Sequence, residues 1–231
     1  MADVLTITQP CALDLEVADG VHPPGESSLE LARYLFSVRG KSVLDLGCGT
    51  GLFGIVASKL GAREVFATDV NPAATECTRR NALRNKAQVA VRTGDLFDPV
   101  RGQKFDLIVT NPPQTPAPPG ARGPKFAGPD GLLYFDTILG QALKYLEEGG
   151  QILTFLISLA DTKRYEGMLA EQFRFRALPK SRREFSRDEY DAYHPGLFAF
   201  LEERRAKGLA EFEEENGKFY FHVRYYMAIR R

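Results

Sequence analysis

Residues 111–114 read Asn-Pro-Pro-Gln and directly follow the apolar run FDLIV. That run predicts a buried strand, so Asn111 stands at the end of the strand with two prolines behind it. Proline has a fixed φ and no backbone N–H, which makes the nearby acceptors rigid and free of a competing donor. Such a stretch is suited to holding a polar ligand in one orientation. A proline-rich strand exit that binds nothing is the alternative.

Glycines 47, 49 and 51 in VLDLGCGTG form a second stretch with chemical potential, in a predicted strand-to-helix turn. Glycine lets the backbone turn sharply and approach a ligand closely, with the N–H groups of the helix facing it. The dinucleotide fingerprint G-x-G-x-x-G fails here, because Leu52 occupies the position of the third glycine. Taken alone, the loop also fits a tight turn without a ligand.

Two acidic residues follow the next two predicted strands, Asp69 in TDVNP and Asp95 in GDLFD. In doubly wound sheets, an acid after the second strand accepts hydrogen bonds from ribose hydroxyls. Each acid would alternatively serve as a helix cap. Together with the glycine loop and Asn111, they place glycine or polar residues at the carboxyl ends of four successive strands. Ligands bind at that edge of a parallel sheet.

The elements that must position these residues alternate between strand and helix from residue 41 to 160, which predicts a parallel sheet covered on both faces. Asn71 is expected to cap a helix that has Pro72 in its first turn. We expect strands at 42–46, 64–70, 87–95, 104–111 and 151–158, and helices at 51–61, 71–85 and 130–150.

The whole chain is expected to form one domain of residues 1–231. Residues 1–40 would be an N-terminal extension with a helix at 26–38, residues 41–160 the cofactor-binding core, and residues 161–231 an insert with the final strands. Within the last part we expect a helix at 161–173, an extended stretch at 174–186, a charged helical segment at 187–210 and a hairpin turning at Asn216-Gly217.

The 231 residues include 30 basic and 30 acidic side chains. This balance argues against the broad basic surface typical of nucleic-acid binding. The N-terminus lacks the features of a signal peptide, and the apolar stretch QILTFLISLA is too short for a membrane span. We therefore expect a soluble, cytoplasmic protein without a membrane partner.

Cysteines and histidines give no sign of a metal site. Three cysteines without CxxC spacing predict reduced thiols, neither a disulfide framework nor a zinc site. The histidines are too dispersed to bind a metal together. These residues are Cys11, Cys48, Cys77, His22, His194 and His222.

The motifs VLDLGCGTG, TDVNP, GDLFD and FDLIVTNPPQ, in this order and spacing, resemble those of class I S-adenosylmethionine-dependent methyltransferases. Asn-Pro-Pro narrows the resemblance to a branch that includes release-factor glutamine N5-methyltransferases and N6-adenine methyltransferases. The upstream VHPPGESSLELARYL is similar to the segment before the cofactor loop in the glutamine enzymes. The resemblance covers residues 20–160. It implies an α/β, Rossmann-like fold with a seven-stranded, mostly parallel sheet, an antiparallel last strand and helices on both faces.

The same resemblance implies S-adenosylmethionine as the cofactor and a role for each motif. The glycine loop would surround the methionine part, and Asp69 would hold the ribose hydroxyls beside Val70. Asp95 and Leu96 would flank the adenine. The expected cofactor residues are Asp45, Gly47, Gly49, Gly51, Asp69, Val70, Asp95, Leu96 and Asn111, and the expected catalytic residues are Asn111, Pro112, Pro113 and Gln114.

In the implied reaction, Asn111 and the Pro112 carbonyl would hold the nitrogen that becomes methylated. An amide or exocyclic amine nitrogen is a poor nucleophile because its lone pair is delocalised. Two acceptors on its two N–H groups would aim that lone pair and favour the positive charge that develops. A general base is not needed before the transfer, since the proton can leave afterwards.

Gln114 departs from the branch, which usually has Tyr or Phe at this position. An aromatic ring stacks on a flat substrate, and Gln does so much less well. Adenine in nucleic acid is therefore disfavoured as the acceptor, and a carboxamide or other small group is favoured. Gln114 would contact the substrate directly, or an aromatic residue of the insert would replace the missing ring.

We therefore predict methyl transfer to an amide or amine nitrogen of a protein side chain or a small molecule. A nucleobase amine is the second candidate, and a non-catalytic, cofactor-binding partner subunit is the third. The acceptor, the oligomeric state and any required partner stay open.

The insert carries two further candidates. One is a basic cluster that would bind phosphate or carboxylate, although its acidic neighbours favour a solvated surface of mixed charge. The other is a set of aromatic residues that would form a substrate lid or the core of the insert. These residues are Lys180, Arg182, Arg183 and Arg187 for the first, and Tyr190, Tyr193, His194 and Phe198 for the second.

Overall fold

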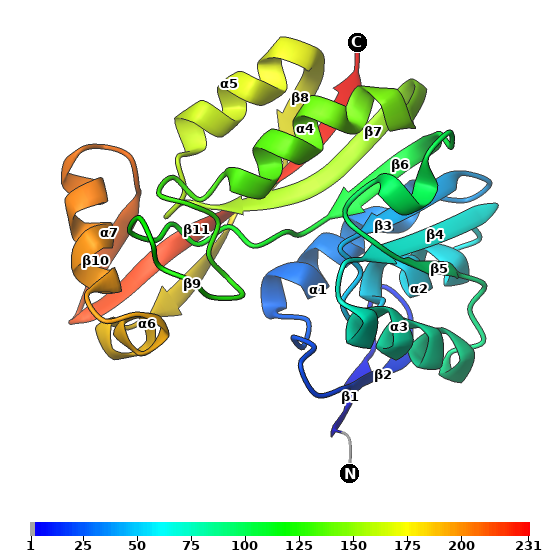
Figure 1. The fold of residues 1–231 in the computed structure, drawn as a ribbon, viewed down its shortest axis with the longest axis horizontal. Coiled ribbons are helices and arrows are strands. Elements are labelled where there is room, and N and C mark those ends of the chain that lie inside the picture. Colours follow the sequence, from blue (N-terminus) through cyan, green and yellow to red (C-terminus); the bar gives the residue numbers. More distant parts are fainter. Residues whose placement is uncertain (1–2) are drawn as a thin grey trace. The chain divides into compact units, whose positions relative to one another are not determined.

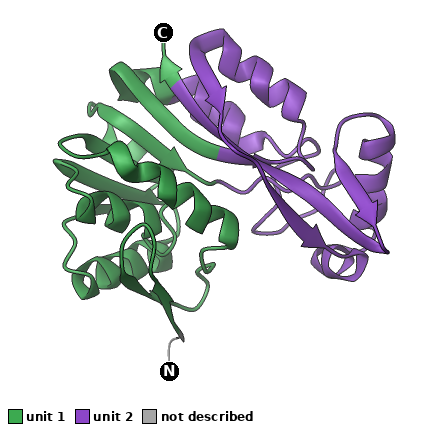
Figure 2. Ribbon diagram, turned by 180° about the vertical axis from the view of Figure 1, so that it is seen from behind, with its two compact units in different colours: residues 1–111, 142–154, 229–231 green, residues 112–141, 155–228 purple. Residues whose placement is uncertain are grey.

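The computed structural model describes residues 3–231, which form two compact units (Figure 2). Unit 1 contains residues 1–111, 142–154 and 229–231, and unit 2 contains residues 112–141 and 155–228. Three elements, a helix that spans residue 141, a strand that spans residue 154 and the last strand, have residues in both units. The division into a single domain with boundaries near 40 and 160 stays a prediction.

The sheet of unit 1 is parallel throughout. Its strands lie in the order β7-β6-β3-β4-β5 (Figure 1), and all four neighbouring pairs run in the same direction. Strands that leave a parallel sheet in one direction have their carboxyl ends on the same edge. The strands are β3 (Ser42–Leu46), β4 (Glu64–Asp69), β5 (Ala90–Thr93), β6 (Phe105–Thr110) and β7 (Leu146–Ile157).

The helices of unit 1 begin and end close to where the sequence predicts them. The Asn71 side chain accepts a hydrogen bond from the Ala73 N–H at 3.0 Å, and Pro72 is the first helical residue, so the predicted cap is confirmed. The elements are α1 (Glu26–Ala32), the 3₁₀ helix η1 (Arg33–Ser37), α2 (Leu52–Lys59), α3 (Pro72–Arg84) and the 3₁₀ helix η2 (Asp98–Val100).

An N-terminal hairpin, β1 (Asp3–Ile7) and β2 (Leu13–Val17), was not expected from the sequence. Its position depends on two buried side chains, one in α3 and one directly after this helix. The Asn81 amide bonds both the N–H and the carbonyl of Glu16, and the Asn85 amide does the same at Asp14. These contacts join residues 65 to 71 positions apart, so no local pattern announces them.

The boundary between α4 (Leu133–Tyr145) and β7, which lies in the 142–154 segment of unit 1, corrects one prediction. The helix predicted to reach residue 150 ends at Tyr145, and the following Glu-Glu-Gly-Gly belongs to β7, which begins at Leu146 rather than at 151. Phe105 of β6 pairs with Leu146, and this pairing draws the segment into the sheet. The remaining elements are α4 (Leu133–Tyr145), α5 (Thr162–Gln172), β8 (Phe173–Ala177), β9 (Ser181–Phe185), α6 (Arg187–Tyr193), α7 (Leu197–Ala206), β10 (Phe212–Glu215) and β11 (Lys218–Arg230).

The last strand, β11, runs antiparallel to both β9 and β10. The predicted hairpin turn between β10 and β11 is confirmed, because Asn216 and Gly217 have φ values of 52° and 74°. Two positive φ angles in succession are those of a type I′ turn, for which Asn-Gly is the favoured pair. The main strand path, β10-β11-β7-β6-β3-β4-β5, has the seven strands predicted, and β8 and β9 add to it by pairing with β11.

Aromatic rings form the core of the insert around Phe185. Tyr190 and Phe198 are both buried. Of the two alternatives for these residues, a substrate lid or the core of the insert, burial supports the core. Ring pairs of this geometry stabilise a core beyond the area that they bury. The rings that contact Phe185, at centroid distances of 4.9 to 5.9 Å, are those of Tyr190, Phe198, Phe212, Phe219 and Phe221.

Replacing Asn81 by alanine is expected to lower the free energy of unfolding by roughly 2–4 kcal/mol, because buried backbone groups at Glu16 and Thr50 lose a partner. Urea unfolding measures this loss, provided that the m-value of the variant equals that of wild type. Leu83→Ala on the same helix is the control, since Leu83 is 82% exposed and its truncation is expected to cost less than about 0.5 kcal/mol. Equal losses in the two variants would contradict the role of Asn81.

Candidate functional site

The glycine loop follows β3, a strand that is buried along its whole length. Gly47, Gly49 and Gly51 all have positive φ, at 78°, 53° and 85°. At Gly51 space is restricted as well, because an added Cβ would lie 2.8 Å from the Thr78 side chain of α3. A Cβ added at Gly47 or Gly49 would instead meet no atom within 4 Å. The loop thus packs on α3 at one end and faces open space at the other.

Backbone and side-chain acceptors of β4 hold this loop. The N–H groups of Gly47 and Cys48 both donate to the Thr68 carbonyl, at 2.8 and 2.9 Å. Asp69 Oδ2 accepts from the Gly49 N–H at 3.0 Å, and its Oδ1 accepts from the Asn71 N–H at 2.9 Å. The carboxylate is therefore fixed between the glycine loop and the start of α3. A carboxylate has about four lone-pair positions, so Asp69 retains capacity to accept from a ligand.

Asp45 lies behind the loop and is fully buried. Its Oδ2 accepts from the Gly54 N–H of α2 at 2.8 Å, whereas Oδ1 has no hydrogen-bond partner within residues 3–231. Burial raises the pKa of this carboxyl to about 8; the Gly54 bond opposes the rise and the nearby Asp69 charge adds to it. The neutral acid is thus the main form of Asp45 at pH 7.

A cavity in unit 1 joins the glycine loop to Asn111 at the end of β6. The segment before α1 forms another side of it, and α2 contributes Leu52 and Phe53. The Asn111 Nδ2 donates to Ser28 Oγ at 3.0 Å, so the two side chains are held together in the cavity wall. The lining residues are His22, Pro23, Pro24, Ser28, Gly47, Cys48, Gly49, Thr50, Leu52, Phe53 and Asn111.

The remaining expected cofactor residues lie at the ends of β4 and β5 and do not line this cavity. Val70 is 66% exposed, and Asp95 is exposed as well. Leu96 has a φ of 41°, and its carbonyl accepts from Thr68 Oγ1 at 3.1 Å. The Gly94 N–H donates to the Asp69 carbonyl at 3.0 Å, which keeps the two strand ends together. The ends of β6, β3, β4 and β5 thus follow one another along one edge of the sheet.

Pro112, Pro113 and Gln114 belong to unit 2. Gln114 is only 6% exposed, and its side-chain amide bonds to backbone groups of β7. Its predicted contact with a substrate stays a prediction. The segment after Pro113 is ordered by backbone bonds between Thr115 and residues 125 and 127.

The sequence did not single out the residues that α1 and the segment before it bring to the cavity. The similarity of this stretch to the glutamine enzymes marked it as a whole, without a role for any one residue. His22 and Ser28 carried no periodicity or spacing of their own that would have identified them. Their signal is the proximity to Asn111, 83 positions further along the chain in the case of Ser28.

The structure also shows what surrounds Cys48 and Arg182, two further residues that the sequence singled out. Burial raises the pKa of the Cys48 thiol, so this cysteine is inert in the cavity wall. Arg182 pairs with Glu213 and Glu215 and lies over the Tyr220 ring, which suits a surface of mixed charge.

Across the described part of the chain, no group of His, Cys, Asp or Glu side chains is arranged to hold a metal ion. None of the described helices is long and apolar enough to cross a membrane.

The carboxyl-edge cavity, the glycine loop and the fixed acid after β4 define an α/β protein that binds a nucleotide-containing cofactor. The family model described as methyltransferase small domain matches residues 26–186. The chain therefore belongs to this family, and it is an S-adenosylmethionine-dependent methyltransferase with a Rossmann-like fold.

Relatives and solved structures agree with this assignment. Over 157 residues the chain is 32% identical to a putative protein N5-glutamine methyltransferase of Methanocaldococcus jannaschii, with 65% of this chain and 79% of that protein covered. Over 167 residues it is 33% identical to a release factor glutamine methyltransferase of Geobacter sulfurreducens, with 66% and 59% covered. The T. thermophilus 16S rRNA N2 G1207 methyltransferase, solved with AdoMet and guanosine, has a TM-score of 0.66 at 21% identity, which shows the shared fold. The match to that structure covers all of this chain but only 50% of the other chain. This chain therefore spans between half and four fifths of the length of these three proteins.

The residues present suit S-adenosylmethionine. The glycines leave open space over the loop, where any side chain at Gly47 or Gly49 would protrude. The fixed Asp69 carboxylate has remaining acceptor capacity for hydroxyl groups, and the unpartnered Asp45 Oδ1 lies behind the same loop. When bound, the cofactor would supply the methyl group, which it carries on a positively charged sulfur. The chain supplies the loop, the carboxylate and the fixed amide of Asn111.

The raised pKa of Asp45 predicts a pH effect on stability. The folded state keeps a proton up to about pH 8 that the unfolded state loses near its ordinary pKa of about 3.9. The free energy of unfolding therefore falls as the pH rises through this window, by at most about 1.4 kcal/mol per pH unit. Asp45→Asn removes this contribution, so its melting temperature is expected to improve relative to wild type between pH 5 and pH 8. Thermal unfolding at several pH values measures it, and a difference that stays constant with pH would argue against a buried neutral acid.

Proposed function

We propose that this methyltransferase methylates the side-chain amide nitrogen of a glutamine in a protein. The observation that carries the proposal is the Asn111 amide, held by Ser28 in a cavity that it shares with the cofactor loop. Pro112 follows Asn111 directly in the chain. Neither Pro112 nor Pro113 has a backbone N–H that would lie beside the Pro112 carbonyl. The names of the glutamine methyltransferases among the relatives support the same acceptor.

The chain's part in this reaction is to hold and orient the acceptor. One N–H of the acceptor amide donates to the Asn111 side-chain oxygen and the other to the Pro112 carbonyl. These bonds strengthen as positive charge develops on the nitrogen, so they stabilise the transition state more than the ground state. Asn111 Nδ2 donates to Ser28 Oγ, and this bond holds the Asn111 side chain beside α1.

An exocyclic amine of a nucleobase is the second candidate acceptor. The rRNA methyltransferase shares the fold, but the identity of 21% carries no argument about its substrate. The charge balance of 30 basic and 30 acidic residues favours protein over nucleic acid. A partner subunit without turnover is the third candidate. Turnover by the purified protein would exclude it.

The decisive experiment supplies methyl-labelled S-adenosylmethionine and a cell extract that is separated afterwards into protein, nucleic-acid and small-molecule fractions. The expected result is label in protein, released after digestion as N5-methylglutamine. Label in nucleic acid would establish the second candidate. Binding of the cofactor without label in any fraction would establish the third candidate. The control is a known glutamine methyltransferase, which must label protein in a matched extract.

Replacing Asn111 by alanine is expected to lower the rate of methyl transfer by roughly 10²–10³-fold, because one of two acceptors for the developing charge is lost. The dissociation constant of S-adenosylhomocysteine, measured by calorimetry, is expected to change by no more than about threefold. A rate close to that of wild type would refute the role of Asn111.

Replacing Ser28 by alanine is expected to slow methyl transfer by about tenfold, because the Asn111 amide loses the bond that fixes its orientation. The matched control is Ser27→Ala, which removes the neighbouring hydroxyl and is expected to keep the wild-type rate. The readout is the initial rate at saturating cofactor. Equal rates for the two variants would separate Ser28 from catalysis.

A further inference from the structure

The parallel pairing between β6 and β7 stops where the prolines begin. Its last paired residues are Val109 and Leu153, but β7 continues to Ile157. Pro112 and Pro113 have no N–H to donate, so the chain after β6 is unable to continue the ladder with its own backbone. Phe155 and Ile157 are buried, and their backbone groups on that side require partners from elsewhere.

The side-chain amide of Gln114 supplies these partners. Its Oε1 accepts from the Ile157 N–H at 2.7 Å, and its Nε2 donates to the Phe155 carbonyl at 3.3 Å. In a parallel ladder, one residue donates to the carbonyl before its opposite residue and accepts from the N–H after it. Gln114 makes this pair of bonds around Leu156, so its amide takes the place of a backbone peptide group.

The same nitrogen also reaches the backbone of the motif. Gln114 Nε2 lies 3.5 Å from the Pro112 carbonyl oxygen, a long contact that links this carbonyl to the end of β7. Gln114 is thus connected at once to the strand and to the proposed acceptor of the substrate N–H. We call this arrangement the Gln114 amide bridge.

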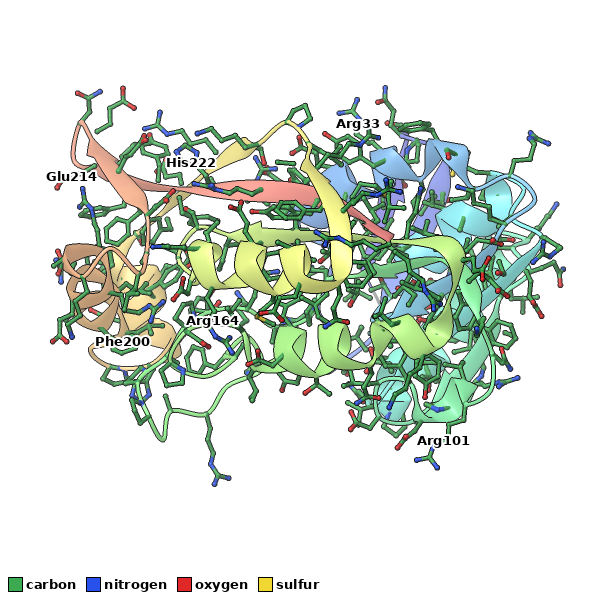
Figure 3. The ribbon with its side chains drawn as sticks, turned by 90° about the horizontal axis from the view of Figure 1, so that it is seen from above. Arg33, Arg101, Arg164, Phe200, Glu214 and His222 are labelled. Atoms are coloured by element: carbon green, nitrogen blue, oxygen red, sulfur yellow. The ribbon has the colours of Figure 1, made fainter. Side chains whose placement is uncertain are left out.

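The backbone of Gln114 is restricted as well. Gly131 has a φ of 80°, and a Cβ added there would lie 2.6 Å from the Gln114 carbonyl oxygen and 2.8 Å from Ala160 Cβ. Gly131 therefore packs directly against the main chain at 114, where no side chain would fit. Near Gly131, Arg164 pairs with Asp130 and Asp136, and Figure 3 shows its side chain between α5 and α4. The Gln114 amide bridge is therefore fixed from both its side chain and its main chain.

We propose that Gln114 is a positioning residue, which fixes the Pro112 carbonyl toward the acceptor nitrogen through this bridge and does not itself contact the acceptor. The inference rests on the proposed function and deepens it. An amide that is buried and bonded to β7 offers no flat ring for a base to stack on. Recognition then depends on two hydrogen-bond acceptors, which suits a carboxamide and disfavours a purine.

The first test measures the bridge without any acceptor. In Gln114→Met, which has similar length but no hydrogen-bonding group, amide hydrogen exchange at Ile157 is expected to be about tenfold faster than in wild type. Gln172→Met on α5 is the matched control and is expected to leave that exchange unchanged. Binding of S-adenosylhomocysteine is expected to stay within about threefold, since the glycine loop is not altered. Unchanged exchange at Ile157 in Gln114→Met would overturn the proposal.

The second test uses turnover, with a synthetic peptide that contains a single glutamine as the probe. For a positioning residue, Gln114→Met is expected to lower kcat by about tenfold with little change in KM. For a residue that contacts the acceptor, KM would rise instead, and that result would overturn the proposal. If wild type fails to methylate the peptide, the proposed function is at fault, and the exchange at Ile157 still decides whether the bridge exists.

Two more variants keep the inference testable if Gln114→Met folds poorly. Gln114→Glu keeps the acceptor for the Ile157 N–H and loses the donor to Pro112 and Phe155, so exchange at Ile157 is expected to stay near wild type while kcat falls. Gln114→Tyr restores the aromatic residue of the related branch but makes neither bond of the bridge. It is expected to speed exchange at Ile157 and to lower kcat. Wild-type exchange and turnover in Gln114→Tyr would show that the bridge has no role.

Discussion

The cofactor loop depends on three hydrogen bonds that two acceptors at the end of β4 receive. The Thr68 carbonyl accepts from two successive N–H groups of the loop, and the Asp69 carboxylate accepts from a third, that of Gly49. The shape of the loop is therefore set by the neighbouring strand as much as by its own glycines. Since β3 and β4 pair with Leu46 opposite Thr68, the register of the sheet places the loop. A shift of one residue in that pairing would remove all three bonds together.

Much of the fold could be predicted from the sequence because its signals are local. The Asn71 cap, the Asn216-Gly217 turn and the alternation of apolar strands with helices each lie within a few residues of one another. The N-terminal hairpin lacked such a signal, because Asn81 and Asn85 on a distant helix hold it. The start of β7 was misplaced for a similar reason. A Gly pair that normally ends a helix became part of a strand once Leu146 had paired with Phe105.

The candidate site shows the same division. Motifs that are contiguous in sequence, such as the glycine loop and Asn111, indicated both their position at the sheet edge and their chemistry. The proposed roles of Ser28 and Gln114 rest on pairings over 83 and over 41 to 43 residues, which no motif contains. Gln114 was visible only as a departure from the aromatic residue of the related branch. What replaced the ring, an amide bonded into the end of a strand, required coordinates.

The rings around Phe185 give the insert a core of its own, built from β9, β10, β11 and the helices between them. Surface residues of this segment surround a hydrophobic centre that has no share in the glycine loop or in Asp69. Substitutions on that surface are therefore expected to leave the binding of the cofactor intact. Across generations, a lineage of such enzymes is free to explore new acceptors by altering the insert while one unchanged sheet continues to provide the methyl-transfer chemistry.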